Sequence, residues 1–373
     1  MRFIHTADWH VGKKLHGFDL LEDQLYIFQQ LKNISLDKKV DAIVVAGDIY
    51  DRSLPNEQCV QTVNQLLEEL NLQAKLPLFV INGNHDSAVR LDTGSQWFDA
   101  TDFYLRTSFA QAFEPVVFAD VQFFMLPYFE PQEARNYFED QEIATTAQAV
   151  KRAVKEMQKL FLPDKKHVLI AHFFAAGSTK SASETLLEVG GLSPVGTDCL
   201  EIFDYVALGH LHDKNALKHP NIKYSGTPLK YSLAEANSQK GVWLVDTKEQ
   251  TSEFIALEPK HDVKVLKGAF ADLTEPSFVA TINRDDYIGI ELTDTQIIVN
   301  AMERLRSCYP KTLSLKRVNW SNDLLGFTPK EELKHLEPIE LLQGFFEEVN
   351  QNAISQKQLQ WAKQALIDVQ KEV

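Results

Sequence analysis

The sequence has few cysteines, a deficit of positive charge and no long hydrophobic run. Cys59, Cys199 and Cys308 are its only cysteines, and an odd, widely spaced set fits neither a disulfide framework nor a thiolate zinc site. No apolar run approaches the roughly 18 residues needed to cross a bilayer. The first residues lead into a predicted strand without the apolar core of a signal peptide. We therefore expect a protein of the reducing cytoplasm that makes no membrane contact.

Basic residues are outnumbered, with 38 Lys and Arg against 52 Asp and Glu and a net charge of −14. This balance argues against a protein that holds nucleic acid by a generally basic surface. It leaves room for a nucleic-acid enzyme whose contacts are local or are supplied by a partner. The 373 residues, 44% of them hydrophobic, are sufficient for two domains with packed cores and a smaller module.

Short apolar runs recur through the first 210 residues. Continuous apolar character over a few residues is typical of strands buried on both faces, and the runs are 3–4, 42–45, 78–81, 168–170 and 205–208. Helical patterns at 21–31, 60–70 and 147–160 lie between them, and 113–118 with 121–126 predicts a hairpin. Strands that alternate with helices indicate an α/β layered domain.

The pattern changes after about residue 259. Predicted strands at 263–266, 278–282, 287–292 and 313–318, with a helix at 297–308, indicate a small α+β module. A polar linker around 321–334 then precedes two amphipathic helical patterns that follow Pro338. We expect three parts, with boundaries at 1–260, 261–320 and 321–373.

Polar side chains follow each predicted strand of the first part. In open α/β sheets the ligand site lies beyond the carboxyl ends of the strands, so these side chains are expected at one edge. They occur in Asp8-Trp9-His10, Gly47-Asp48-Ile49-Tyr50-Asp51, Gly83-Asn84-His85-Asp86, His172 and His210-Leu211-His212. Asp8 with His10 and His210 with His212 stand two residues apart, which places both members of a pair on one side of an extended segment.

Carboxylates, an amide oxygen and imidazoles suit the hydrolysis of a phosphoester. The substrate is anionic and repels hydroxide, whereas two metal ions about 3.5–4 Å apart neutralise it and activate water. Oxygen and imidazole ligands without thiolates favour manganese, iron or zinc. Glycines 47, 83 and 209 permit close approach of the loops. Singly, each motif has a plain structural interpretation: Asp48 as a helix cap, Asn84 and Asp86 as turn residues, His172 as a core histidine. For His5 and His167 we keep that structural interpretation.

Together the motifs resemble the calcineurin-like metallophosphoesterase superfamily, whose pattern D-x-H, G-D-x-x-D, G-N-H-[D/E], H, G-H-x-H is filled at every position. The resemblance implies a layered β-sandwich core with helices on its faces. It assigns one metal ion to Asp8, His10, Asp48 and His212, and the other to Asp48, Asn84, His172 and His210. It makes His85 the catalytic histidine, facing the leaving oxygen, with Asp51 and Asp86 as orienting carboxylates.

Longer stretches are similar to the family of bacterial SbcD nuclease subunits, among them 5–13, 46–51 and Tyr224-Ser225-Gly226-Thr227-Pro228. This resemblance covers essentially the whole chain. It implies a manganese-dependent 3′→5′ double-strand exonuclease and single-strand or hairpin endonuclease of DNA repair and recombination. It also implies a homodimer that works with an SbcC-like coiled-coil ATPase.

Two sets of residues each have two interpretations, as contacts to another molecule or as ordinary structural residues. Lys13, Lys14, His16, Arg52 and Arg90 lie on loops beside the expected ligands and are candidates for DNA phosphate contacts, although ordinary solvated charge explains them equally well. Leu342, Phe345, Phe346 and Trp361 on the C-terminal helices are candidates for the partner surface; packing within the chain is the alternative.

Two rival functions also remain. A phosphomonoesterase or cyclic-nucleotide phosphodiesterase of the same superfamily would use the same metals but would not need the added module and tail. A scaffold that has lost catalysis would lack at least one ligand, and every ligand is present.

Overall fold

The structure, a computed structural model, describes residues 1–179, 193–318, 338–350 and 353–371. It divides into two compact units, the first formed by Met1–Val265 with Arg284–Gly289 and the second by Leu266–Asn283 with Ile290–Val373. The three-part division expected from the sequence stays a prediction, and the predicted linker at 321–334 lies within a segment outside the described residues.

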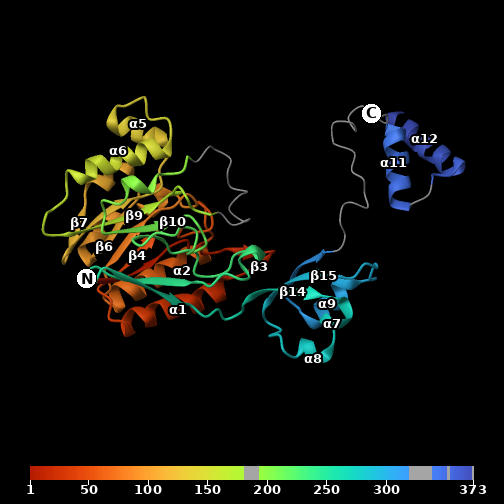
Figure 1. Cartoon of the computed structure of the whole chain (residues 1–373), viewed down its shortest axis with the longest axis horizontal. Coiled ribbons are helices and arrows are strands. Elements are labelled where there is room, and N and C mark those ends of the chain that lie inside the picture. Colours follow the sequence, from red (N-terminus) through yellow and green to blue (C-terminus); the bar gives the residue numbers. More distant parts are fainter. Residues whose placement is uncertain (180–192, 319–337, 351–352, 372–373) are drawn as a thin grey trace. The chain divides into compact units, whose positions relative to one another are not determined.

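Two β-sheets face each other in the first unit (Figure 1). The six-stranded sheet has the order β13 (Thr251–Ala256), β12 (Gly241–Asp246), β1 (Arg2–Thr6), β4 (Ala42–Ala46), β5 (Leu78–Ile81) and β6 (Phe103–Arg106). The five-stranded sheet has the order β11 (Ile222–Tyr224), β10 (Tyr205–Gly209), β9 (Lys166–His172), β8 (Val121–Leu126) and β7 (Val116–Phe118). The short pair β2 (Lys14–Leu15) and β3 (Phe18–Asp19) follows β1.

The central strands of both sheets are parallel. β1, β4, β5 and β6 run in one direction, and β8 to β11 also run parallel to one another. The predicted hairpin is confirmed as the antiparallel pair β7–β8. Parallel strands bring their carboxyl ends to the same edge of a sheet, so each sheet offers one edge at which following loops gather.

Aromatic and branched side chains fill the layer between the sheets. Phe79 of one sheet stacks on Phe123 of the other with ring centroids 4.0 Å apart, and both are buried with Phe3, Val44, Val168 and Tyr205. Every residue of β4 is buried, which explains its uninterrupted apolar sequence. The expected β-sandwich with helices on its faces is confirmed.

Helices cover the outer faces of the sandwich (Figure 1). Those of the first unit are α1 (Leu21–Asp37), α2 (Glu57–Glu68), α3 (Ala88–Leu91), α4 (Ser95–Phe98), α5 (Pro131–Phe138) and α6 (Thr146–Gln158). Helix α6 packs Val150, Val154 and Met157 into a core with the outward side chains of β8, β9 and β10. A capping box at Thr145 and Gln148 begins this helix, as the local sequence permits.

A small three-stranded sheet has the order β14 (Val263–Gly268), β15 (Tyr287–Leu292) and β16 (Thr312–Arg317). The division between the two units falls within β14 and β15, and β16 belongs to the second unit. The helices of the second unit are α7 (Phe270–Leu273), α8 (Pro276–Val279), α9 (Ala301–Cys308), α11 (Pro338–Asn350) and α12 (Gln356–Lys371). Among the described helices, none has both the length and the apolar character needed to span a membrane.

The predicted strand at 278–282 is wrong. Helix α8 occupies its start, because Pro276 at the first helical position fixes a helical φ and the N–H groups of Val279 and Ala280 donate to the carbonyls of Glu275 and Pro276. The predicted helix at 297–308 is also shorter than expected. It begins at Ala301, whereas Ile297 and Val299 are exposed.

Candidate metal centre

Loops from both sheets meet at one edge of the first unit. The loops after β1, β4 and β5 come from the six-stranded sheet, and those after β9 and β10 come from the five-stranded sheet. The N–H of Asp8 donates to the carbonyl of Gly47 (3.0 Å), and the N–H of His10 donates to the carbonyl of Asp48 (2.9 Å). These bonds extend the β1–β4 pairing past the ends of the strands, and they bring the first two motifs together.

The segment that carries Asp8 and His10 is not extended, which corrects the expectation from spacing. Asp8, His10 and Asp48 all have left-handed backbone conformations, with φ of 51°, 44° and 52°, and His210 has φ of 97°. Non-glycine residues in this region are uncommon and cluster at functional sites. The side chains therefore converge because the backbone turns sharply at these residues, and not because residues two apart lie on one side of an extended strand.

Several buried polar atoms of this cluster have no hydrogen-bond partner among the described residues. They are Oδ2 of Asp8 and both ring nitrogens of His10, in side chains that are at most 1% exposed. Burying such groups without partners is costly, and such an atom needs an explanation, for example an ion. Asp8, His10 and Asp48 also offer ligand atoms that lie within 4.8 Å of one another. These residues fit a metal ion.

The Asp48 carboxylate lies between the two halves of the site. Its Oδ2 is 3.6 Å from Nε2 of His10 and 3.4 Å from Nε2 of His172, while its Oδ1 accepts a hydrogen bond from the N–H of His85 (2.8 Å). One carboxylate oxygen thus faces histidines from both sheets. This is the position that a carboxylate shared by two ions requires.

A second convergence surrounds Asn84. Its Oδ1 is 3.0 Å from Nε2 of His172 and 3.1 Å from Nδ1 of His210. Nδ1 of His172 lies 2.8 Å from the carbonyl of Ala46, so this nitrogen donates, and loss of the Nε2 proton on binding of a cation would expose a lone pair at Nε2. The amide oxygen and the imidazole nitrogens point to a common place, which fits a second cation.

The electrostatics of the cluster favour added positive charge. Burial raises the pKa of Asp8 to about 7. Burial opposes a charge on His172, but the Asp48 carboxylate outweighs it and raises the pKa of His172 to about 9. Burial and the neighbouring His172 lower the pKa of His210 to about 3, which keeps that ring neutral, as a metal ligand must be.

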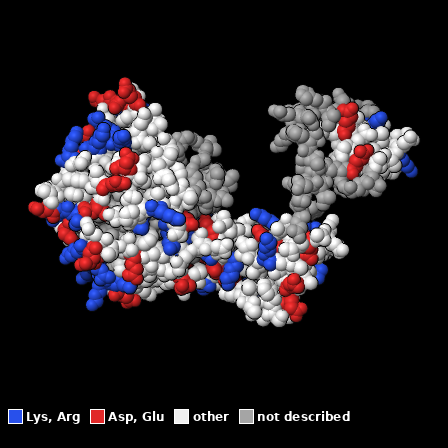
Figure 2. All heavy atoms as spheres, in the orientation of Figure 1, with Lys and Arg blue, Asp and Glu red and all other residues white. Residues whose placement is uncertain are grey.

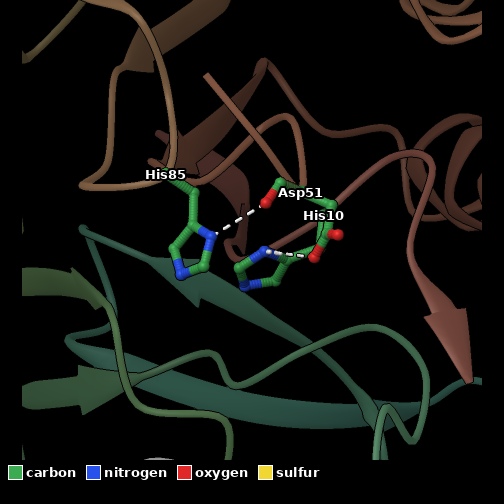
Figure 3. Close-up of side chains that lie close together, drawn as sticks. All are labelled: His10, Asp51 and His85. Atoms are coloured by element: carbon green, nitrogen blue, oxygen red, sulfur yellow. Dashed lines mark hydrogen bonds and ion pairs between the residues drawn. The ribbon is translucent and has the colours of Figure 1, made fainter. Parts of the chain in front are cut away.

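The side chains of His85, Asp51 and His10 lie close together at the site (Figure 3). Nδ1 of His85 lies 2.9 Å from the backbone carbonyl of Asp51, which leaves Nε2 for another partner. The Asp51 carboxylate instead faces Nδ1 of His10 at 3.8 Å and accepts from Nζ of Lys13 at 2.8 Å. These three side chains also form a group able to hold a cation.

Asp86 braces the backbone of the site. Its carboxylate accepts hydrogen bonds from the N–H groups of Gly83 (2.9 Å), Ile49 (3.0 Å) and Tyr50 (2.9 Å). These three bonds hold the loops after β4 and β5 against each other, in keeping with an orienting role. Gly83 permits this contact, since a Cβ there would overlap Oδ1 and the backbone nitrogen of Asp48.

Sequence reasoning missed a buried network behind His10 and His212. Nε2 of Gln24 donates to the carbonyl of His10 (2.8 Å) and to the Tyr231 hydroxyl (2.9 Å). Glu235 is 1% exposed; its Oε1 lies 3.5 Å from Nδ1 of His212, and its Oε2 pairs with Lys240 at 2.7 Å. Ser232 and Glu235, three residues apart, match a capping pattern that signals such a turn, whereas no sequence signal points to Gln24.

His5 and His167 follow the structural interpretation. His5 is fully buried, with its ring nitrogens 3.0 Å from the Tyr205 hydroxyl and 3.2 Å from the Leu208 carbonyl. The ring of His167 stacks on Phe161 at 3.8 Å. Neither of them is brought into the metal cluster.

The candidate DNA-contact residues differ in exposure and in ion pairing. The charge of Lys13 is engaged by Asp51, whereas the Arg52 side chain is 82% exposed. Lys14, His16 and Arg90 are exposed on the β2–β3 pair and helix α3.

The candidate partner contacts lie on α11 and α12. Leu342 (36%), Phe345 (67%) and Trp361 (63%) are exposed, and Phe346 is half-buried.

Comparisons with known proteins agree with this geometry. The model of the calcineurin-like phosphoesterase family matches residues 1–214, and that of the type 5 capsule protein repressor C-terminal domain matches residues 259–350. The D subunit of the SbcCD nuclease from Staphylococcus epidermidis is 34% identical over 361 residues, covering 96% of each chain. The corresponding protein of Staphylococcus saprophyticus is 33% identical over 351 residues, 94% of this chain and 93% of that one.

A solved structure of a dimetal phosphatase from Danio rerio covers 69% of this chain and 99% of its own, at 11% identity and a TM-score of 0.37. The family matches and the curated relatives show that the chain belongs to the calcineurin-like phosphoesterases and, within them, to the family of the SbcCD nuclease D subunits, as a metal-dependent hydrolase.

Proposed function

We propose that this chain hydrolyses DNA phosphodiester bonds with two manganese ions, as a 3′→5′ double-strand exonuclease and a single-strand and hairpin endonuclease. The observation that carries the proposal is the position of Asp48, whose Oδ2 faces histidines from both sheets. The relatives named as nucleases supply the substrate class.

Two ligand sets share Asp48. Asp8, His10 and His212 complete one, and Asn84, His172 and His210 complete the other. Bound there, two divalent cations would neutralise the phosphate and lower the pKa of an attacking water. Oxygen and imidazole donors without thiolates favour manganese over soft metals.

His85 serves as the proton donor to the leaving oxygen. The carbonyl of Asp51 fixes its Nδ1, so the ring presents Nε2 to the substrate in one orientation. The backbone N–H of His85, rather than its ring, contacts Asp48. Asp51 and Asp86 orient other groups of the site. Asp51 faces His10 and Lys13, and Asp86 holds the loop backbone.

The part of the chain after residue 260 serves DNA and partner binding. Residues 261–320 would form the DNA-capping module, and 321–373 the linker and helices that bind an SbcC-like ATPase. The relatives are named as one component of the SbcCD nuclease, and α11 exposes Leu342 and Phe345. We also propose a homodimer, working in the reducing cytoplasm that suits three free cysteines.

The test is incubation of the purified chain and manganese with end-labelled single-stranded, duplex and hairpin DNA. Cyclic nucleotides and a phosphoserine peptide serve as small-substrate controls. We expect nicking of single strands and opening of hairpins, with slow hydrolysis of the small esters. Preference for a small phosphoester would instead favour the phosphomonoesterase or cyclic-nucleotide phosphodiesterase interpretation.

A further inference from the structure

A group of lysines without carboxylate partners lies just past the metal-site motif of β10. Lys214, Lys218 and Lys223 line a hollow of about 400 Å³ with Trp243. Within the described parts of the chain, none of these three ammonium groups forms an ion pair. The chain as a whole is acidic, with 52 acidic and 38 basic residues, and on the face shown in Figure 2 basic side chains stand in small groups among acidic ones.

Two of these lysines make cation–π contacts with aromatic rings. Nζ of Lys214 lies 3.9 Å from the ring centroid of Phe254, and Nζ of Lys223 lies 4.9 Å from that of Trp243. A cation–π contact steadies an ammonium group without neutralising its charge. Lys223 is partly buried, and this burial lowers the pKa of its amine. The charges are thus fixed in place and remain available to an anion.

Two acidic groups near the hollow contact lining residues other than the lysines. The Asp213 carboxylate accepts the N–H of Asn215 at 2.8 Å, and Glu201 faces His219 at 3.8 Å. Glu253 neighbours Phe254 on β13, and successive side chains of a strand point to opposite faces. The hollow is therefore a local positive region on an acidic protein.

The lysine group is linked to the metal centre through neighbouring residues. Lys214 follows His212 by two residues, at most about 7 Å of chain. Trp243 pairs with His5 across β12 and β1, and β1 leads directly into Asp8. Lys223 on β11 and Trp243 on β12 come from the two different sheets, so their contact joins the two sheets.

We propose that Lys214, Lys218 and Lys223 form a binding site for the phosphate backbone of a single DNA strand that extends from the metal centre. This inference rests on the proposed function. Lysine ammonium groups bind backbone phosphates irrespective of base. The site compensates locally for the net negative charge of the chain.

The test compares two triple variants of the full chain, both in a His85→Gln background so that bound DNA persists. One carries Lys214→Gln, Lys218→Gln and Lys223→Gln. The matched control carries Lys151→Gln, Lys155→Gln and Lys159→Gln on and just after α6, which changes net charge equally. Fluorescence anisotropy with a labelled single-stranded oligonucleotide and manganese gives Kd over a series of salt concentrations.

We expect the first triple to weaken binding by about tenfold or more and to reduce the slope of log Kd against log salt by about 2, since each single-strand phosphate contact contributes about 0.7. The control triple should match its parent. With His85 intact, the first triple should hydrolyse bis(p-nitrophenyl) phosphate at the parent rate. An unchanged slope, an equal loss in both triples or a parallel loss on the small diester would overturn the proposal. A parent that does not bind DNA would instead reject the proposed function.

Discussion

The backbone N–H of His85 donates a 2.8 Å hydrogen bond to Oδ1 of Asp48. This bond ties the loop after β5 to the loop after β4, and it does not involve the imidazole. The ring of His85 and the carboxylate of Asp48 can therefore be tested separately, because a substitution at position 85 keeps this backbone hydrogen bond.

His85→Ala should retain the bound metal and lose turnover. A positioned general acid contributes about 10²–10⁴-fold to the rate, so kcat on single-stranded DNA should fall within that range while manganese content stays at the parent value. Metal analysis of the purified variant provides the check. A variant depleted of manganese would make His85 a ligand rather than a proton donor.

Gly83→Ala should disrupt the site, since its Cβ would overlap Asp48 Oδ1. Overpacking of this kind costs about 1–3 kcal/mol, and the melting temperature and manganese affinity should fall together. Gly344→Ala on α11 is the matched control, because nothing lies within 4 Å of a Cβ there. The account would be contradicted by a Gly83→Ala protein that melts and binds manganese like its parent.

Substitutions in the Glu235–Lys240 pair can separate effects on stability from effects on manganese affinity. Glu235→Gln leaves Lys240 buried with an uncompensated charge, and breaking such a pair costs about 3–5 kcal/mol. It also removes the carboxylate beside His212, which should weaken manganese binding by about 10–100-fold.

The double variant Glu235→Gln with Lys240→Met removes both charges. It should recover much of the lost stability in denaturant unfolding but not the manganese affinity measured by calorimetry. Recovery of both properties together would show that Glu235 stabilises the fold without orienting His212.

Much of the site was predictable from sequence, and the errors have physical causes. Buried parallel strands have a local apolar signature, and their following loops must share an edge, so the cluster from Asp8 to His212 could be expected. The left-handed turns at Asp8 and His10 could not, because they depend on hydrogen bonds to Gly47 and Asp48.

Contacts between distant parts of the chain were the least predictable. Gln24 reaches Tyr231 across 207 residues, and neither residue type signals the other. The run at 278–282 has β-branched and aromatic residues suited to a strand, but Pro276 and local hydrogen bonds make its start helical. Local propensity is overridden there by the position of one proline.

Deletion of residues 331–373 should leave manganese binding and single-strand nicking nearly intact, because all the proposed ligands end at His212. It should abolish co-purification with an SbcC-like ATPase and ATP-dependent processing of duplex ends. Phe345→Glu with Leu342→Glu should have the same effect, since unpaired charge in a desolvated contact costs several kcal/mol; Gln343→Glu on the same helix is the control. A truncated chain that melts earlier yet still binds the ATPase would reject the partner surface.

Electron paramagnetic resonance during a manganese titration tests the shared Asp48 carboxylate most directly. We predict that the full chain binds two Mn²⁺ ions whose spins are exchange-coupled, because the two proposed ligand sets share Asp48, and that EDTA removes both ions and the activity. Asp48→Ala should lose the coupled signal and the bound metal. A parent chain that binds a single ion, or two ions with uncoupled spectra, would contradict the two-metal account.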